Sequence, residues 1–332
     1  MPITVGKKGD RLWHAIEERG VYIGMRTMFF AYSLFGRVGF SVILYPVMAY
    51  FFLASPTARR ASLGFLSRVQ RHEDTGSPPT NPPGWRQSFR HFLSFGETIL
   101  DKLAAWRGDI SLQDVDYVNR EAFEAVQASG RGCVLIGSHL GNMEVCRALG
   151  SEYRDLKINA LVHTTHSENF NRLMRRINPR ATLSLIQVTE VGMETAMMLR
   201  EKIDHGEVVV IVGDRTPVGL SSRITWLPFL GDPAPFPQGP FILAALLKCP
   251  ILMLFCLKRQ NRFCIIFETL TKEIELPRRK RNEALARIMA LYVERLQHYC
   301  VGAPYQWYNF FDFWAQAGTD ATDQTAGKLS PE

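Results

Sequence analysis

The central part of the chain alternates between short apolar runs and longer amphipathic segments. The apolar runs at 132–139 and 207–214 have the length and β-branched composition of buried strands. The segments at 114–130 and 190–206 have the spacing of amphipathic helices. Strands that alternate with helices of this length predict a mostly parallel central sheet flanked by helices on both faces. We therefore predict an α/β domain over residues 85–316.

The same pattern changes towards the end of this domain. Two apolar runs, at 249–258 and 262–270, follow each other closely, which predicts two further strands and is compatible with a hairpin. The segment 282–300 then has the period of an amphipathic helix. Residues 317–332 are polar, and we expect a flexible tail there.

The N-terminal part is much more apolar. Residues 38–54 form a run of 17 uncharged residues, slightly short of the roughly 20 that a membrane-spanning helix needs, and Pro46 interrupts it. Arginines flank the run on both sides, at positions 37, 59, 60, 68 and 71. This pattern favours a membrane-associating helical region over 1–72, followed by a proline-rich loop over 73–84. The alternative is a helix buried in the protein's own core.

The net charge of +7 would attract anionic lipid, acidic proteins or nucleic acid. The basic residues lie in separate clusters without interleaved aromatics, so we do not predict a nucleic-acid partner. The cationic run at 276–283 is expected to be a solvated surface, with an acidic carrier protein or anionic lipid as alternative partners.

His139 ends the predicted strand at 132–139, and Glu144 follows five positions later. Chemistry in α/β sheets gathers where strands end and helices begin, so the two side chains could form a pair. Glu144 would accept the Nδ1 proton of His139 and leave Nε2 free as a general base, while backbone N–H groups of the following turn would bind an oxyanion. The alternative is that His139 only packs at the strand end and Glu144 meets the helix dipole.

Several charged residues are candidates for substrate binding. Asp214 and Arg215 end the apolar run at 207–214, and Arg223 follows nearby. Arg172 and Arg175 share one face of a predicted helix and could hold a phosphate group, with a solvated surface as the alternative.

Neither a metal nor a cofactor is predicted. His163 and His166 have the spacing of zinc ligands, but no third ligand lies at a suitable distance. Phe229, Phe236 and Phe241 surround a proline-rich loop, where they either line a channel for an alkyl chain or pack in the core.

The stretch GSHLGNME at 137–144 resembles the H-x4-D/E box of the lysophospholipid acyltransferase superfamily, and more narrowly of its bacterial lipid A biosynthesis branch, in which the acidic residue is glutamate. The resemblance extends over roughly 15–315. It includes Asp214 in a turn, Phe229 with Gly231, and then a proline-marked strand. Arg215 stands where many lipid A enzymes have glutamine, and the C-terminal QWYNFFDFW is also unlike their usual ending, which suggests another acyl acceptor.

This resemblance implies a membrane-associated O-acyltransferase at the cytoplasmic face of the bacterial inner membrane. It would move an acyl chain from an acyl carrier protein or coenzyme A thioester to a hydroxyl of a lipid or glycolipid. His139 would be the base and Glu144 its orienter, and Arg172 or Arg175 would hold the acceptor's phosphate. A lipid esterase or hydrolase is the alternative enzyme, although its G-x-S-x-G motif is absent from the sequence. A non-enzymatic membrane-binding protein is the other alternative.

Overall fold

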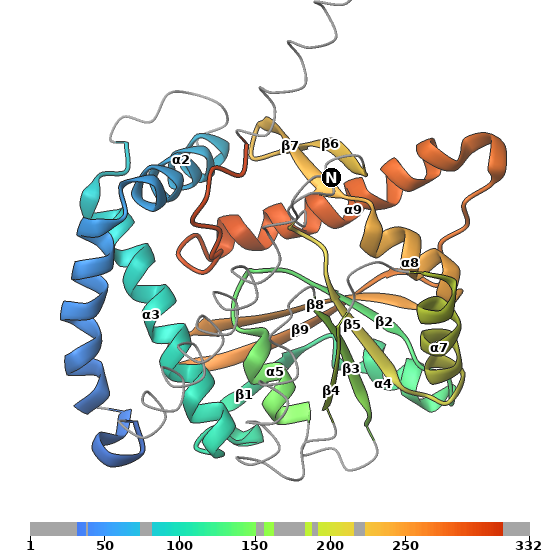
Figure 1. Ribbon diagram of the computed structural model, residues 1–332, viewed down its shortest axis with the longest axis horizontal. Coiled ribbons are helices and arrows are strands. Elements are labelled where there is room, and N and C mark those ends of the chain that lie inside the picture. Colours follow the sequence, from blue (N-terminus) through green and yellow to red (C-terminus); the bar gives the residue numbers. More distant parts are fainter. Residues whose placement is uncertain are drawn as a thin grey trace, which may run out of the picture.

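The computed structural model describes residues 32–37, 39–73, 82–150, 156–162, 183–187, 192–215 and 223–314. Within them, the chain folds around one seven-stranded sheet (Figure 1). Across the sheet, the strands follow the order β1 (Val115–Val118), β9 (Arg262–Thr271), β8 (Ile251–Arg259), β2 (Val134–Gly137), β5 (Val208–Val212), β3 (Ile158–Val162) and β4 (Leu183–Gln187). The predicted α/β class is confirmed.

The sheet is mostly parallel, as the sequence predicts. Among its neighbouring strands, only β8 and β9 pair in the antiparallel sense. These two strands are joined by Gln260 and Asn261, whose φ angles are +48° and +63°. Two consecutive residues with positive φ give the type I′ turn whose twist matches that of a hairpin. The two apolar runs at 249–258 and 262–270 are therefore a hairpin within the sheet.

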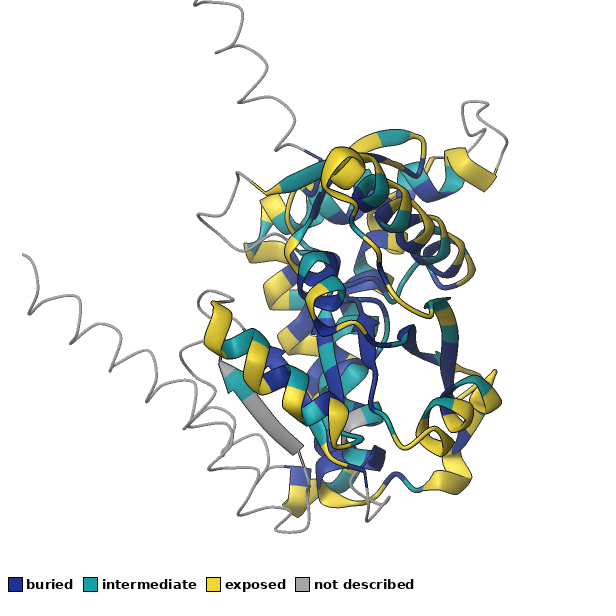
Figure 2. Cartoon of the chain, turned by 90° about the vertical axis from the view of Figure 1, so that its right-hand side faces the viewer, coloured by how far each residue is buried: buried dark blue, intermediate teal, exposed yellow. Residues whose placement is uncertain are grey.

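Helices cover both faces of the sheet, whose strands are largely buried (Figure 2). One face carries α3 (Trp85–Arg107), α4 (Arg120–Ala128) and α5 (Met143–Gly150), and the other carries α7 (Met193–Asp204), α8 (Gly239–Leu247) and α9 (Arg281–Gly302). Because side chains alternate along a strand, Leu135 packs with the first group, and Val134 and Ile136 pack with the second. This division explains why the central strands β2 and β5 contain no polar side chain.

A small second sheet forms where the sequence predicts a proline-rich loop. β6 (Ile224–Phe229) and β7 (Asp232–Pro237) pair in antiparallel fashion beside α9. Pro233, Pro235 and Pro237 alternate along β7, so their missing N–H groups all fall on one edge. Because β7 has only one partner strand, prolines on its open edge cost no hydrogen bond in the ladder. The prediction of a proline-rich loop around Phe229 and Phe236 is therefore wrong, because prolines at alternate positions are compatible with an edge strand.

The helix Gly39–Ala54 packs one face along α3. Its buried residues recur every four positions, at Phe40, Leu44, Met48 and Phe52. Gly96 of α3 permits this close approach, since a Cβ atom there would lie only 2.8–2.9 Å from side-chain atoms of Leu44 and Met48. Any larger residue at position 96 would therefore require the side chains of Leu44 and Met48 to shift.

The opposite face of this helix is apolar and exposed. Val42, Tyr50 and Leu53 are each at least two-thirds exposed, at 69%, 67% and 73%. The helix meets α2 (Pro56–Glu73) at an angle of 94°. Among the described residues, no single helix is long and apolar enough to cross a bilayer, and this bent pair meets that test only when both helices are taken together. The membrane-associating role of residues 1–72 therefore stays a prediction.

A chain of buried polar groups joins α2 to α3. Ser88 Oγ donates a hydrogen bond to Ser62 Oγ over 3.0 Å, and Ser62 Oγ lies 3.1 Å from Nδ1 of His91. His91 Nε2 lies 3.0 Å from the backbone oxygen of Trp307. Burial lowers the pKa of His91 to about 4, so its imidazole is neutral at neutral pH.

We expect His91 to lower the free energy of unfolding in acid. Its pKa is about 4 in the folded chain and 6.5 when unperturbed. Below pH 6.5 the unfolded chain therefore binds a proton that the folded chain does not bind, and stability falls until the pH reaches about 4. The whole difference between these two pKa values corresponds to ~3 kcal/mol of unfolding free energy. Urea unfolding at pH 7 and pH 5 should show a smaller loss in His91→Gln than in the wild type. Equal losses would show that His91 does not contribute.

Candidate functional site

Strands β2 and β5 end side by side, and the chain leaves them in opposite directions. Gly137 at the end of β2 pairs with Val212 at the end of β5. The chain from β2 continues through α5 to β3, beyond β5, whereas the chain from β5 continues through α8 to β8, on the other side of β2. Open α/β sheets bind ligands in the crevice outside such a switch point. His139 and Asp214 each lie two residues past these paired ends.

His139 and Asp214 form a close pair just beyond these strand ends. Nδ1 of His139 lies 2.8 Å from Oδ1 of Asp214, and the backbone N–H of His139 donates to Oδ2 over 2.9 Å. The Asp214 side chain is fully buried, whereas that of His139 is 30% exposed. Because an ionised carboxylate only accepts hydrogen bonds, a neutral His139 carries its proton on Nδ1 and has a free lone pair on Nε2.

Asp214 is held in its ionised form despite its burial. Burial on its own would raise the pKa of the carboxyl group, but the charge of His139 and the hydrogen bonds from its ring and backbone outweigh burial. A further hydrogen bond comes from Nε1 of Trp307, which donates to Oδ2 over 3.0 Å. The pKa of Asp214 therefore lies below its ordinary value.

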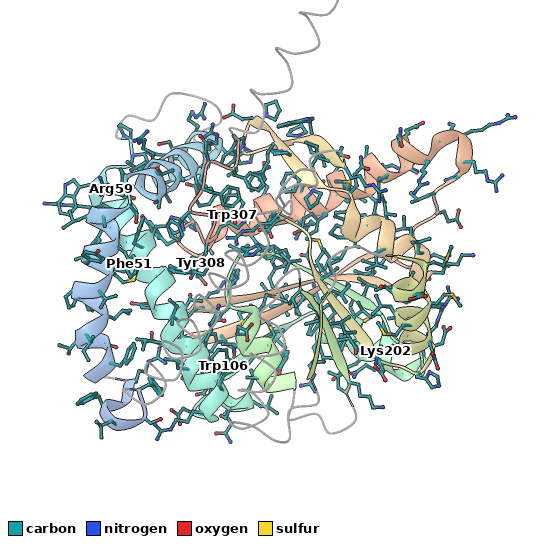
Figure 3. The ribbon with its side chains drawn as sticks, in the orientation of Figure 1. Phe51, Arg59, Trp106, Lys202, Trp307 and Tyr308 are labelled. Carbon is teal, nitrogen blue, oxygen red and sulfur yellow. The ribbon has the colours of Figure 1, made fainter. Side chains whose placement is uncertain are left out.

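Residues 306–309 hold the pair from the C-terminal side. The N–H of Tyr308 donates to the carbonyl oxygen of His139 over 3.0 Å, and Nδ2 of Asn309 lies 3.3 Å from Oδ2 of Asp214. Trp307 and Tyr308 lie in the middle of the molecule (Figure 3). The sequence did not predict a role for this segment. Trp307 and Asn309 stand within an aromatic run, and the sequence does not reveal their contacts with Asp214, which lies 93 and 95 positions away.

Glu144 does not have the contact expected of it. It lies in the first turn of α5, and its Oε2 accepts a hydrogen bond from Nε1 of Trp106 of α3 over 3.3 Å. Nδ1 of His139 faces Asp214 instead. The expectation that Glu144 accepts the Nδ1 proton is therefore wrong in this structure. The reason is that β2 and β5 are neighbours in the sheet, which brings a distant carboxylate closer to His139 than the local one.

The turn after His139 is pinned to the rest of the domain. Gly141 has a φ of +78°, and a Cβ atom there would lie 2.0 Å from the backbone oxygen of Cys256. Its N–H donates to the oxygen of Gln306, and the N–H of Asn142 donates to the oxygen of Cys256, each over 2.8 Å. These two N–H groups are thus already engaged, although the sequence suggested them as oxyanion donors.

The two predicted cations near Asp214 have different environments. Arg215 donates from Nε to Oδ1 of Asn309 over 2.5 Å and from Nη2 to the oxygen of Tyr308 over 2.8 Å. It therefore braces the 306–309 segment beside the pair. Arg223 is exposed at the start of β6, and its carbonyl oxygen accepts a hydrogen bond from the N–H of Gln238.

Other predicted residues lie outside the described part of the chain. These are Arg172, Arg175, His163 and His166. Within the described ranges, no group of three or more histidine, cysteine or acidic side chains is arranged to hold a metal ion.

An apolar cavity of about 80 Å³ lies under α5, between α4 and the sheet. Its walls include Leu135, Cys146, Leu149 and Leu254, and the exposed side chain of Arg120 also lines it. The three phenylalanines considered for a channel are elsewhere: Phe229, Phe236 and Phe241 are fully buried in the core on the opposite face. They pack against other core residues, as the alternative interpretation of the sequence states.

Comparison with known proteins agrees with the sequence motif. Residues 90–314, about two thirds of the chain, match the model of a family described as bacterial lipid A biosynthesis acyltransferase. The matched region begins within α3 and contains the whole sheet, His139, Asp214 and the 306–309 segment. No curated protein matches the chain.

Proposed function

The chain belongs to the bacterial lipid A biosynthesis acyltransferase family, and we propose that it transfers an acyl chain from an acyl carrier protein or coenzyme A thioester to a hydroxyl of a lipid or glycolipid. Membership of this family makes it an acyltransferase that acts on lipid. The donor, the acceptor hydroxyl and the roles of individual residues are parts of the proposal.

The observation that carries this proposal is the partly exposed imidazole of His139 held by a buried carboxylate at the switch point of the sheet. Nε2 takes the proton of the acceptor hydroxyl as its oxygen attacks the thioester carbonyl. Asp214 stabilises the imidazolium that forms. When the tetrahedral intermediate collapses, the carbon–sulfur bond breaks and Nε2 returns the proton to the leaving thiolate. The products are the acylated lipid and the free thiol.

We place the acyl chain along α5. This helix begins three residues after Leu140, next to the catalytic pair, and its Cys146 and Leu149 line the apolar cavity. A thioester carbonyl beside His139 would direct its alkyl chain towards that cavity, where burial of each methylene contributes about 0.8 kcal/mol. Arg172 and Arg175 are proposed to bind the acceptor's phosphate, with Arg215 and Arg223 as further cations.

The proposal is tested by product identification. The purified protein is incubated with labelled acyl carrier protein thioester, or with labelled acyl coenzyme A, and with a total bacterial lipid extract. We expect the label to appear in one class of lipid, as an ester. Free fatty acid without an acylated lipid would indicate a lipid esterase instead, and no turnover of either donor would favour a non-enzymatic membrane-binding protein.

We further propose that the exposed face of helix Gly39–Ala54 lies against the cytoplasmic face of the inner membrane. Its exposed apolar side chains suit the acyl–headgroup boundary, and Arg59 and Arg60 follow at the bend, where cations meet anionic headgroups. Arg59 also caps the helix, since its Nη1 donates to the oxygen of Leu53 over 2.6 Å. The family is membrane-associated in general, and this face is the candidate for that contact.

The double variant Tyr50→Glu/Leu53→Glu should bind vesicles of phosphatidylethanolamine and phosphatidylglycerol at least 10-fold more weakly. Burying one large apolar side chain contributes about 1.5–3 kcal/mol, and the change also adds repulsion from anionic lipid. Vesicle co-sedimentation measures the effect. The matched control is Met193→Glu/Met197→Glu on α7, in which two exposed apolar side chains are likewise replaced by glutamate. Equal weakening by both pairs would count against a specific membrane face.

A further inference from the structure

The buried polar chain between α2 and α3 ends at the proposed catalytic pair. The carbonyl oxygen of Trp307 can only accept, so His91 Nε2 carries a proton and donates to it over 3.0 Å. A neutral His91 must then accept at Nδ1, and Ser62 is the donor there, at 3.1 Å. The direction of every hydrogen bond is thereby fixed, from Ser88 through Ser62 and His91 to Trp307.

Trp307 connects this chain to Asp214. Its backbone oxygen receives the hydrogen bond from His91, while its indole Nε1 donates to Oδ2 of Asp214 over 3.0 Å. Asp214 in turn accepts from Nδ1 of His139. Hydrogen bonds, together with the covalent structure of Trp307 between its backbone oxygen and its indole, therefore connect α2 and α3 to the imidazole of His139.

The segment that carries Trp307 contacts both members of the pair. Tyr308 donates to the backbone oxygen of His139, Asn309 lies against Asp214, and Gln306 accepts from Gly141 in the turn after His139. A displacement of this segment would move the base and the carboxylate together. His91 holds the segment at one carbonyl oxygen, and its ring also packs against the ring of Phe310, the residue that follows the segment, with a centroid distance of 4.6 Å.

A polar chain is an unusual way to join two helices in an apolar interior. Ser62, Ser88 and His91 are all fully buried, and hydrophobic side chains of similar volume would avoid the cost of removing three polar groups from water. What a buried network adds is a single defined geometry, because any other arrangement leaves a group unpaired. The surrounding rings of Phe65 and Phe310 provide contact area, whereas His91 donates a side-chain hydrogen bond to the Trp307 carbonyl oxygen, which also accepts from the backbone N–H of Asn309 over 3.0 Å.

We infer that His91 is a positioning residue for acyl transfer, which holds Trp307 so that Asp214 and His139 stay aligned. The inference rests on the proposed function, since it concerns the rate of the step that His139 performs. His91 does not touch substrate or the reacting atoms. It acts through the Trp307 carbonyl and the 306–309 segment.

The test uses two amides that differ by one methylene. In His91→Gln the side-chain amide reaches the place of Nε2 and still donates to Trp307, whereas in His91→Asn it reaches only the place of Nδ1 and that donor is lost. We expect kcat to fall about 10-fold in His91→Asn and no more than a few-fold in His91→Gln, with KM for both substrates unchanged. His91→Phe keeps the volume and loses the donor, so it should resemble His91→Asn.

These outcomes separate positioning from packing. If packing alone mattered, His91→Phe would be the most active of the three, and that result would overturn the inference. Trp307→Phe provides a second measurement that does not depend on variants at position 91. We expect His91→Asn to slow the Trp307→Phe variant by a smaller factor than it slows the wild type, because the indole of Trp307 is one of the contacts through which His91 acts, whereas fully multiplied losses would contradict the inference. Failure of the proposed function would differ from both outcomes, since the wild type would then transfer no acyl group.

Discussion

His139→Ala should lower the rate of acyl transfer by roughly 10³-fold, within the range that a general base contributes. In this variant no group remains at the position of Nε2 to take the hydroxyl proton, while the buried carboxylate of Asp214 keeps its hydrogen bonds from Trp307 and from the backbone N–H of residue 139. Because the His139 side chain is partly exposed, its removal opens a space that water can enter. We therefore expect the variant to fold and to bind vesicles like the wild type.

The measurement is the initial rate of label transfer from the thioester to lipid, at saturating donor. His205→Ala is the matched control, since His205 is an exposed histidine at the end of α7 and lies outside the site. It should transfer at the wild-type rate. Near-native turnover by His139→Ala would remove His139 as the base, while a loss in both variants would point to a general effect of the substitution.

The position of the site could be predicted from the sequence because it depends on a property of parallel sheets. Two apolar runs end in polar residues, at His139 and Asp214, and the carboxyl ends of parallel strands meet at one edge. Their alternation with helices was enough to place both residues near each other. The order of the strands was not predictable, since β2 and β5 are separated in sequence by two other strands.

The partner of His139 could not be predicted for the same reason. From the sequence, Glu144 is the nearest carboxylate, and a short turn can bring it back to the imidazole. The structure pairs Gly137 with Val212, which brings Asp214 to the imidazole across the strand ends. A contact between residues 75 positions apart depends on strand register, and local spacing contains no information about register.

The role of the C-terminal segment was missed because its chemistry is carried mainly by the backbone. From the sequence, QWYNFFDFW stands out only as unlike the usual ending of the family. Trp307 accepts from His91 through its carbonyl oxygen, and Tyr308 donates to His139 through its N–H. Any residue type except proline could provide the second of these groups. The indole of Trp307 is the part that a sequence could have indicated, because a buried indole N–H needs a partner.

The partner assignment leads to the second large effect. Asp214→Asn should lower transfer by roughly 10⁴-fold, the magnitude associated with loss of the correct histidine tautomer. If the amide presents its NH₂ group to His139, Nδ1 must accept that hydrogen bond. The proton of a neutral His139 then lies on Nε2, which can no longer act as a base. The substitution nearly preserves volume, and the amide oxygen can still accept from Trp307. The fold should therefore survive, as thermal unfolding would show.

Glu144→Gln is the comparison that decides between the two carboxylates. Its amide oxygen can still accept the hydrogen bond from Trp106, so we expect only a few-fold decrease in transfer if Asp214 orients the base. A loss in Glu144→Gln as large as that in Asp214→Asn would instead assign a catalytic role to both residues, and a loss confined to Glu144→Gln would restore the pairing that the H-x4-E spacing suggests. Because the pKa of Asp214 lies below its ordinary value, the carboxylate stays ionised throughout the neutral range. The difference in transfer rate between Asp214→Asn and Glu144→Gln should therefore persist at every pH from 6 to 8. In this range the rate of Asp214→Asn is limited by the changed tautomer of His139, and the charge of a carboxylate at position 214 would not change with pH.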